Sequence, residues 1–358
     1  MEKINNHKFP YDWDLKDTVF TKDKGKVFSC FSCGGGSTMG YKLAGFDVIG
    51  CNEIDPRLME TYKINHNPKY SFIENITTFK LREDLPQELY ELDILDGSPP
   101  CSSFSIAGNR GKDWGKSKAF AEGQVVQILD TLFFDFIDLA KKLQPKVVVA
   151  ENVKGLLMDG ASKYVRKIYR EFDLAGYYVQ HWVLNASKMG VPQTRERVFF
   201  IAIRKNLAIS FLKLVGLFEL IPQLQLVFDE PPIVYGEFAD YTGPSISEHA
   251  KKAWDKRKYG DNNIAVSKAR AGMHISSTST FYLYDDHVAK TITSKGHHGS
   301  LLFSKPLYLS KNELCNISTF PKDYNFIFNP GFIMGMSVPP VMMAQISTQI
   351  YEQWLKFI

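Results

Sequence analysis

The sequence lacks a long apolar run, a large set of cysteines and any internal repeat. None of its apolar runs reaches the roughly 18 to 20 residues that a membrane-spanning helix needs. Its first residues, MEKINNHKFP, lack the charged and then apolar pattern of a signal peptide, so we expect a cytosolic protein without membrane contact. Hydrophobic residues make up 44% of the 358 residues, which excludes a disordered chain and allows one large or two ordinary domains.

The cysteines are few, odd in number and unevenly spaced, which argues against a disulfide framework. Cys30 and Cys33 form a CxxC pair, but no second CxxC and no His-x-x-x-His pattern completes a zinc site. We therefore expect no metal and predict free thiols, one of which could be reactive. The full set is Cys30, Cys33, Cys51, Cys101 and Cys315.

The net charge of the whole chain is small, but positive charge is concentrated in one segment. The formal net charge is only +4, which by itself indicates no class of partner. From Tyr241 to Lys305, however, ten Lys or Arg residues stand against five acidic residues, a net charge of +5. The rest of the chain is therefore close to neutral.

Strand and helix patterns alternate from Lys26 to about Arg204. VFSCF, a glycine cluster, TMGYKLAGF and DVIGCNEID predict a strand, a turn, a helix and a strand. DILDGSPPC, PKVVVAENV, YYVQHWVLNA and RVFFIAIR predict further strands, and residues 123–143 and 164–174 predict helices. Near-continuous apolar strands between helices predict an α/β fold with a mostly parallel sheet covered by helices on both faces.

The alternation ends near Asn206, which predicts a division into domains. Residues 1–25 are polar and aromatic without clear periodicity, so we interpret them as an N-terminal extension. Residues 26–205 would form the sheet domain and residues 206–330, which are basic and rich in short β-like runs, a smaller second domain. Residues 331–358 have a helical pattern, and their apolar face predicts a return to the sheet domain.

A glycine-rich turn follows the first predicted strand. Gly34, Gly35 and Gly36 would let the backbone approach a ligand closely, although many α/β proteins have such a turn for steric reasons alone. About twenty residues later, Glu53 ends the second strand, where a carboxylate can accept hydrogen bonds from ribose hydroxyls. The turn has no Walker lysine, so the pattern favours a nucleoside over a triphosphate.

Three further positions fall at the same expected edge of the sheet. Cys101 follows two prolines at the end of a strand, where ligands of open α/β sheets bind, although a buried cysteine in a turn would have the same pattern. Glu151 ends the strand of ENV, and QTRERV places Arg195 and Arg197 before another strand. Each feature alone is ordinary, and only their order along the chain is informative.

That order resembles the cytosine-5 DNA methyltransferase family across residues 27–345. FSCGGGSTMGYKLAGF resembles its first cofactor motif, NEID the acidic motif, ENIT the adenine-binding motif and GSPPCSSFS the nucleophile loop. DTLFFDF, AENV, VPQTRERVFFIAI, AKTITS with ELCNISTFPKDY, and GMSV resemble the remaining motifs. The resemblance implies a Rossmann-like S-adenosylmethionine-dependent methyltransferase fold with a smaller target-recognition domain.

The resemblance also implies S-adenosylmethionine as the cofactor and S-adenosylhomocysteine as the product. Glu53 would hold the ribose and Ile54 would contact the adenine, and both ends of the chain would contribute to one pocket. The implied cofactor residues are Phe31, Ser32, Cys33, Gly34, Gly36, Glu53, Ile54, Asn75, Ile76, Ser98, Pro100, Leu132, Ser337 and Val338.

For catalysis, the resemblance implies a DNA (cytosine-5-)-methyltransferase acting on a base flipped out of the duplex. Cys101 would add to carbon 6 of the cytosine, and Glu151 would hold ring nitrogen 3. Arg197 would hold the base carbonyl, with Arg195 supporting the same site.

Two segments are expected to contact duplex DNA. Residues 102–123, with a net charge of +2, would form a loop that binds phosphates. The basic segment 241–305 is similar in position to the target-recognition region of the family, although a solvated basic surface would have the same composition. Aromatic residues lie between its charges: Trp254, Tyr259, Phe281, Tyr282 and Tyr284.

The implied setting is a bacterial or phage modification enzyme. We expect a monomer that is cytoplasmic and associated with the nucleoid through DNA, and a cognate restriction endonuclease is a partner that the resemblance allows.

The chain departs from the family pattern at several positions. Cys33 stands where glycine is usual, Ser102 follows the nucleophile where glutamine is common, and Asn75 replaces an aspartate. Ile54 lacks an aromatic face. Met336 replaces an asparagine, and the usual arginine near Leu309 is absent.

Three other functions would share parts of this pattern. A same-fold methyltransferase acting on transfer RNA would keep the chemistry, but the chain lacks the Cys-Phe-Thr tripeptide of that branch. A non-enzymatic relative would bind nucleic acid without Cys101, Glu151 and Arg197 being needed. An NAD-type dehydrogenase would explain the glycine-rich turn alone.

Overall fold

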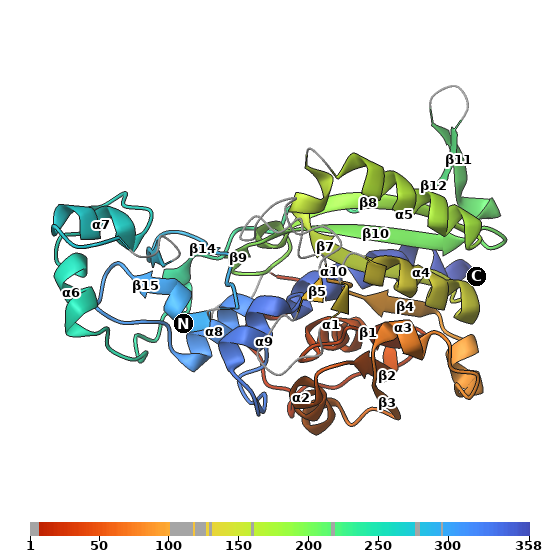
Figure 1. Cartoon of the computed structure of the whole chain (residues 1–358), viewed down its shortest axis with the longest axis horizontal. Coiled ribbons are helices and arrows are strands. Elements are labelled where there is room, and N and C mark those ends of the chain that lie inside the picture. The colour runs from red at the N-terminus through yellow and green to blue at the C-terminus, as the bar shows by residue number, and fades with distance from the viewer. Residues whose placement is uncertain are drawn as a thin grey trace. The chain divides into compact units, whose positions relative to one another are not determined.

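The computed structural model describes residues 7–100, 117–118, 127–128, 131–158, 161–215, 219–275, 280–294 and 296–358 (Figure 1). Its contacts divide the chain into two compact units. The sheet unit contains Phe20–Leu184, Glu196–Val227 and Met343–Ile358. The small unit contains Asn185–Arg195, Phe228–Met342 and the described part of Met1–Val19.

The sheet unit is built on a seven-stranded sheet with the order β3-β2-β1-β4-β7-β10-β8. Neighbouring strands from β3 to β7 are parallel, and β10 is antiparallel to β7. This confirms the predicted mostly parallel α/β sheet. The strands are β1 (Lys26–Cys30), β2 (Asp47–Glu53), β3 (Tyr70–Ile73), β4 (Ile94–Gly97), β7 (Val147–Val153), β8 (Tyr177–Asn185) and β10 (Glu196–Arg204).

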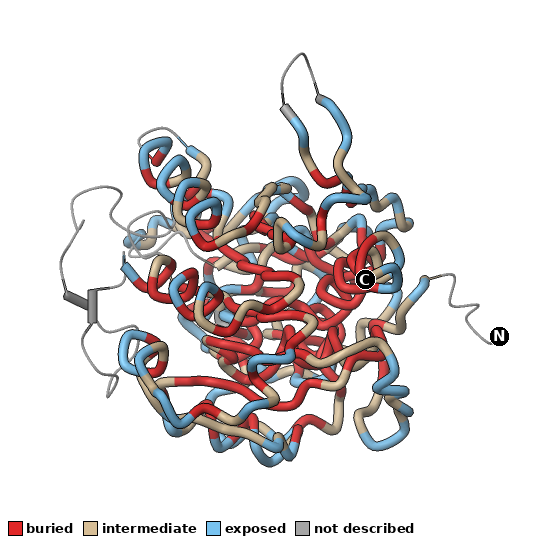
Figure 2. Tube along the Cα trace, turned by 90° about the vertical axis from the view of Figure 1, so that its right-hand side faces the viewer, coloured by how far each residue is buried: buried red, intermediate tan, exposed pale blue. Residues whose placement is uncertain are grey.

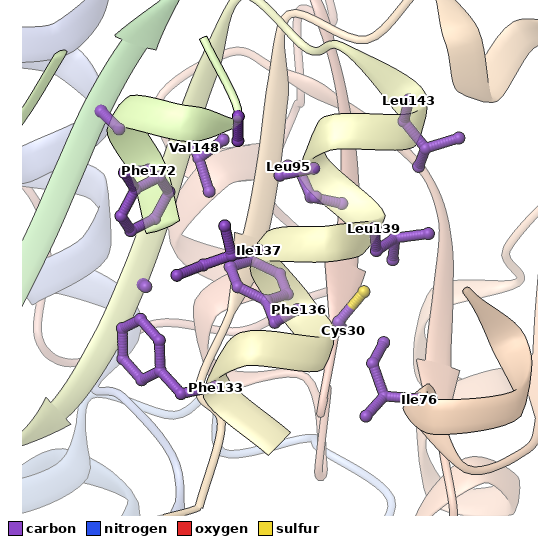
Figure 3. Close-up of a cluster of buried hydrophobic side chains, with 14 of the residues drawn as sticks. Cys30, Ile76, Leu95, Phe133, Phe136, Ile137, Leu139, Leu143, Val148 and Phe172 are labelled. Carbon is purple, nitrogen blue, oxygen red and sulfur yellow. The ribbon is translucent and has the colours of Figure 1, made fainter. Parts of the chain in front are cut away.

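Helices cover both faces of this sheet. One face packs against α3 (Ile76–Phe79), α4 (Leu132–Leu143) and α5 (Ser162–Leu174), and Figure 3 shows Leu95 and Val148 of the sheet beside Phe136 of α4. The opposite face is covered by α1 (Gly36–Leu43) and α2 (Pro56–His66). Figure 2 shows the buried residues gathered along the strands and the inner faces of the helices.

Local sequence explains these elements. In α5, Tyr164, Ile168 and Phe172 recur every four residues, so one face of an otherwise polar helix is buried against the sheet. Helix α2 begins at Pro56, where a missing N–H is harmless, and the side chain of Asp55 caps it by accepting a hydrogen bond from Arg57 N. Gly97 is required because a Cβ there would lie 2.5 Å from the Phe136 ring.

The remaining elements of the sheet unit are short or lie near its C-terminus. They are β5 (Ser117–Lys118), β6 (Gln127–Ile128), β11 (Leu212–Val215), β12 (Glu219–Pro222) and α10 (Pro340–Gln353), which begins in the small unit, with 3-10 turns at Gln87–Tyr90, Lys154–Leu157, Ile209–Phe211 and Leu355–Phe357. Trp354 is fully buried and donates to Gln223 O. The described residues of 206–227 therefore belong to the sheet unit. We had expected them in the second domain.

The small unit combines short strands and helices around its own apolar cluster of Ile246, Ala253, Ile264, Tyr282 and Leu301. Its elements are β9 (Gln193–Thr194), α6 (Glu248–Trp254), α7 (Ile264–Arg270), β13 (Phe281–Leu283), β14 (Ala289–Lys290), β15 (Ser300–Leu302), α8 (Lys311–Ser318) and α9 (Pro330–Met336), with 3-10 turns at Ala186–Lys188, Tyr235–Glu237 and Gly296–Gly299. Strand β14 pairs in parallel with β9, which ties residues 193–194 to residues 289–290.

Two further expectations differ from the structure. The helix expected at 123–143 begins at Leu132, and Gln127–Ile128 instead pair as strand β6 with β5. The described N-terminal residues are not a free extension, because Trp13 is buried and its indole N–H donates to Thr319 O. The buried Trp13 side chain therefore attaches this segment to the small unit, although the sequence of the segment has no periodic pattern. Among the described helices, none is long and apolar enough to cross a membrane.

Candidate active site

The glycine-rich turn after β1 has a backbone that L-residues rarely adopt. Phe31 and Cys33 have φ values of 51° and 47°, and Gly35, the N-cap of α1, has φ 83°. Gly35 N donates to Ser32 O, which closes the turn. Two non-glycine residues in the left-handed region indicate strain of the kind held at ligand-binding sites.

Glu53 braces this turn from the end of β2. Its Oε2 accepts a hydrogen bond of 2.8 Å from Cys33 N, and its Oε1 accepts from Ile54 N and Asp55 N. Burial raises the pKa of Glu53, against the lowering effect of these three N–H donors. Glu53, which we expected to bind a ribose, therefore orders the backbone of the glycine-rich turn through Cys33.

The next strand ends supply the other cofactor residues expected in the sheet unit. Asn75 caps α3 by accepting from Thr77 N at 3.0 Å, and Ile76 is buried behind it. Leu132 is buried at the start of α4, and Ser98 and Pro100 follow β4. Because β1 to β4 are parallel, these positions share the carboxyl edge of the sheet with the turn and Glu53.

Two predicted cofactor residues carry buried hydroxyls that fit a polar ligand. Ser337 Oγ has no hydrogen-bond partner among the described residues, and Ser32 Oγ has none apart from the neighbouring Cys51 thiol. An unsatisfied buried hydroxyl is unfavourable, so a ligand that accepts or donates here would relieve it. Ser337 and Val338 are both buried in the small unit.

Glu151 and Arg197 form an ion pair at the carboxyl end of β7. Arg197 Nε lies 3.0 Å from Glu151 Oε1, with the side chains 15% and 10% exposed. The antiparallel register of β10 on β7 pairs Arg197 with Val153, which sets the guanidinium beside the carboxylate. Burial lowers the pKa of Arg197, and the charge of Glu151 opposes this shift.

Asn152, which we did not predict as a site residue, follows Glu151 in β7 and binds the proline segment. Its Nδ2 donates to Pro99 O at 3.0 Å, and its Oδ1 accepts from Val153 N. The middle residue of ENV therefore fixes the backbone two residues before Cys101. The motif itself was the only available signal, because a single asparagine within a buried strand indicates no specific partner.

Arg195 has a different environment from the one expected of a residue beside the base. It is buried in the small unit, where Nη1 donates to Ile292 O and Nη2 to Gly335 O and Ser337 O. The guanidinium thus holds three backbone carbonyls, including that of a predicted cofactor residue.

The predicted nucleophile lies outside the described residues, as does the greater part of the 102–123 loop. Of the described cysteines, Cys30, Cys51 and Cys315 are buried and burial raises the pKa of each thiol, whereas Cys33 is half-buried. The described residues contain no group of three potential metal ligands.

In the basic segment 241–305, several described lysines are exposed and the aromatic side chains pack against an arginine and against one another. Arg257 lies 3.1 Å from the centroid of the Trp254 ring, and Tyr284 stacks on Phe303 at 4.4 Å. Arg270 pairs with Asp261, so these two arginines are engaged within the unit. The exposed lysines are Lys251, Lys252, Lys256, Lys258, Lys290 and Lys305.

Solved structures identify the class of this fold. A prophage-encoded E. coli protein described as a DNA modification methyltransferase aligns with a TM-score of 0.63 at 19% identity, covering 92% of this chain and 99% of that one. Spodoptera frugiperda DNMT2 aligns with a TM-score of 0.61 at 18% identity, covering 91% and 99%. These likenesses show that the chain shares the fold of these two methyltransferases.

The family follows from sequence. The model of the C-5 cytosine-specific DNA methylase family matches residues 25–352, and the chain belongs to this family. The chain is 40% identical over 186 residues to the type II methyltransferase M.FnuDI of Fusobacterium nucleatum, covering 52% of this chain and 48% of the relative. The type II methyltransferase M1.HphI of Haemophilus parahaemolyticus is 26% identical over 343 residues, covering 90% and 85%. The chain thus spans about half the length of the more identical relative.

Proposed function

We propose that this protein transfers a methyl group from S-adenosylmethionine to carbon 5 of a cytosine in duplex DNA. The observation that carries the proposal is the Glu151–Arg197 pair at the carboxyl end of β7, next in sequence to Asn152, whose side chain binds the Pro99 carbonyl. An acid and a cation at this edge can hold the ring nitrogen and carbonyl of one pyrimidine.

Each residue has a defined role in this proposal. Cys101 adds as a thiolate to carbon 6 and makes carbon 5 nucleophilic, while a proton shared between Glu151 and ring nitrogen 3 stabilises the negative charge developing in the ring. Arg197 keeps Glu151 oriented and binds the base carbonyl. Bound S-adenosylmethionine would supply the electrophilic methyl group that carbon 5 takes up. Loss of the carbon 5 proton to solvent, with departure of the Cys101 thiolate, then restores the aromatic ring.

The cofactor contacts follow the strand ends. The strained turn 31–36 and Ser32 Oγ would receive the methionine and adenosine, Glu53 the ribose, and Ile54, Asn75 and Ile76 the adenine. Because Asn75 Oδ1 already caps α3, the adenine amino group would share that acceptor. In the small unit, Ser337 and Val338 stay predicted cofactor contacts, and Arg195 orders them through the carbonyl of Ser337.

DNA would be recognised by the segment 241–305, with the exposed lysines of its described residues on phosphates and base edges read by neighbouring polar side chains. Extrusion of the target base is required, because carbon 6 cannot be reached inside a stacked duplex. The relatives named above are type II methyltransferases, which supports a modification enzyme with a cognate restriction endonuclease as its partner.

Methylation mapping tests this function. Purified protein, S-adenosylmethionine and unmethylated genomic DNA are incubated, and 5-methylcytosine is mapped by bisulfite sequencing. We expect one short methylated sequence and its loss in Cys101→Ala. Transfer RNA is offered in a parallel reaction, since methylation of RNA alone would select the transfer RNA alternative. Equal background from the wild type and Cys101→Ala on both substrates would refute an enzymatic role.

A further inference from the structure

Asp96, on strand β4, is a fully buried carboxyl group that the proposed chemistry does not use. It is 1% exposed and lies in DGSPPC, one residue before the end of β4. A carboxylate within a central parallel strand is unusual, because such strands are normally apolar on both faces. Its contacts therefore need an explanation.

Three hydroxyl groups from two other elements point at this carboxyl group. Ser29 Oγ of β1 and Ser37 Oγ of α1 each donate to Asp96 Oδ2 at 2.8 Å, and the Tyr41 hydroxyl of α1 donates to Oδ1 at 3.2 Å. Burial raises the pKa of Asp96 to about 6, so near neutral pH the group is an anion that accepts all three hydrogen bonds.

The donors flank the strained turn 31–36. Ser29 lies two residues before the turn, and Ser37 lies in the first turn of the helix that follows it. Glu53 holds the middle of the same turn through Cys33 N. Two buried carboxylates therefore secure the turn, one at its centre and one through both of its flanks.

We propose that Asp96 is a positioning residue for the cofactor, which sets the turn 31–36 in register with the strand that leads to Pro99 and Pro100. This assignment rests on the proposed function. Asp96 joins the proposed nucleophile segment to the proposed cofactor turn, because β4 continues into the first and α1 begins at the second. Charged acceptors give stronger and more directional hydrogen bonds than neutral ones, which suits a backbone held against its preferred φ.

Asp93 provides a matched control on the same stretch of chain. It lies three residues earlier, at the opposite edge of the sheet, where Oδ2 accepts from Lys26 N and Oδ1 pairs with Lys146 Nζ at 3.0 Å. Asp93→Asn should therefore lower the melting temperature without a change at the carboxyl edge.

The experiment measures S-adenosylmethionine binding by calorimetry, with KM, kcat and melting temperature for each variant. We expect Asp96→Ala to raise Kd and KM for S-adenosylmethionine about tenfold or more, with a smaller change in kcat, because hydrogen bonds to a charged acceptor are lost. Asp96→Asn keeps the shape and part of the hydrogen bonding, so it should restore most of the affinity. Asp93→Asn should leave Kd unchanged.

An unchanged Kd in a folded but destabilised Asp96→Ala protein would overturn the assignment. If that variant does not fold, Ser37→Ala and Tyr41→Phe each remove one donor, and we expect a rise in Kd of about threefold in each. Wild-type Kd values in both would equally overturn it. Failure of the unsubstituted protein to bind S-adenosylmethionine would instead refute the proposed cofactor, and this assignment with it.

Discussion

At the scale of single residues, the carboxyl groups of this protein differ mainly in what surrounds them. Glu53 accepts three backbone N–H groups, Asp96 accepts three hydroxyls, and Glu151 faces a guanidinium. Of these three carboxyl groups, Glu151 has the partner suited to share a substrate, because a guanidinium has donors to spare for a base carbonyl.

We predict that Glu151→Gln lowers kcat by about two to three orders of magnitude, because an amide can neither share a proton with ring nitrogen 3 nor pair with the charge of Arg197. Cofactor affinity should not change. The measurement is single-turnover methyl transfer with calorimetric binding of S-adenosylmethionine. Glu196→Gln is the control, since Glu196 is exposed on β10 and pairs only with Lys154. Comparable rates for Glu151→Gln and the control would exclude the assigned role.

The buried carboxyl of Asp96 predicts a pH-dependent stability difference. Its pKa rises from 3.8 to about 6 on folding, so its protonated form favours the native state and this stabilisation is lost as pH rises through about 6. The groups facing it are Glu151, whose charge raises this pKa further, with Tyr41 and the buried Cys30 thiol. Relative to Asp96→Asn, the wild type should lose about 1.5 kcal/mol of unfolding free energy between about pH 5 and pH 8.

Urea unfolding of both proteins across this range measures the difference. Parallel pH curves for wild type and Asp96→Asn would show that Asp96 does not titrate there.

At the scale of elements, the segments 292–293 and 335–337 are held together by hydrogen bonds from Arg195 and by the close approach that Gly335 allows. Arg195 donates to carbonyls in both segments. A Cβ at Gly335 would lie 2.3 Å from the Thr293 carbonyl atoms, so α9 can approach residue 293 only with glycine there. This close packing orders Ser337 and Val338.

Arg195→Met should therefore destabilise the protein by about 3 kcal/mol, because three buried carbonyls lose their donors. Arg166→Met is the control, with an expected loss below about 1 kcal/mol, since that side chain is exposed on α5. Chemical denaturation compares the two. Equal unfolding free energies would mean that the Arg195 contacts contribute nothing to stability.

At the scale of the whole molecule, the net charge is only +4, so the proposed DNA binding would depend on the local basic segment 241–305. Replacing Lys251, Lys252 and Lys256 together by Gln should weaken duplex binding and lower the slope of log K against log salt by about 2 to 3, if each releases one counterion. Lys141→Gln with Lys163→Gln, exposed on α4 and α5, should leave the slope unchanged. Fluorescence anisotropy at several salt concentrations measures it, and equal slopes in both variants would remove 251–256 from the DNA interface.

Sequence alone predicted much of the sheet unit. The strands near VFSCF, PKVVVAENV and RVFFIAIR, and the helix near Tyr164, were predicted because apolar spacing records which face is buried. The start of α4 at Leu132 was not predicted, because it depends on contacts with distant parts of the chain. The burial of Trp13 was not predicted either, because its surrounding sequence has no periodic apolar pattern.

The motifs and their order determined the family and the candidate reacting groups, since chemistry requires particular side chains at particular strand ends. Tertiary structure decided the rest. It paired Arg197 with Glu151, turned Arg195 towards three carbonyls and placed Asp96 beneath three hydroxyls. Such contacts join residues more than forty positions apart, and no local pattern encodes which distant hydroxyl or carbonyl a buried charge will meet.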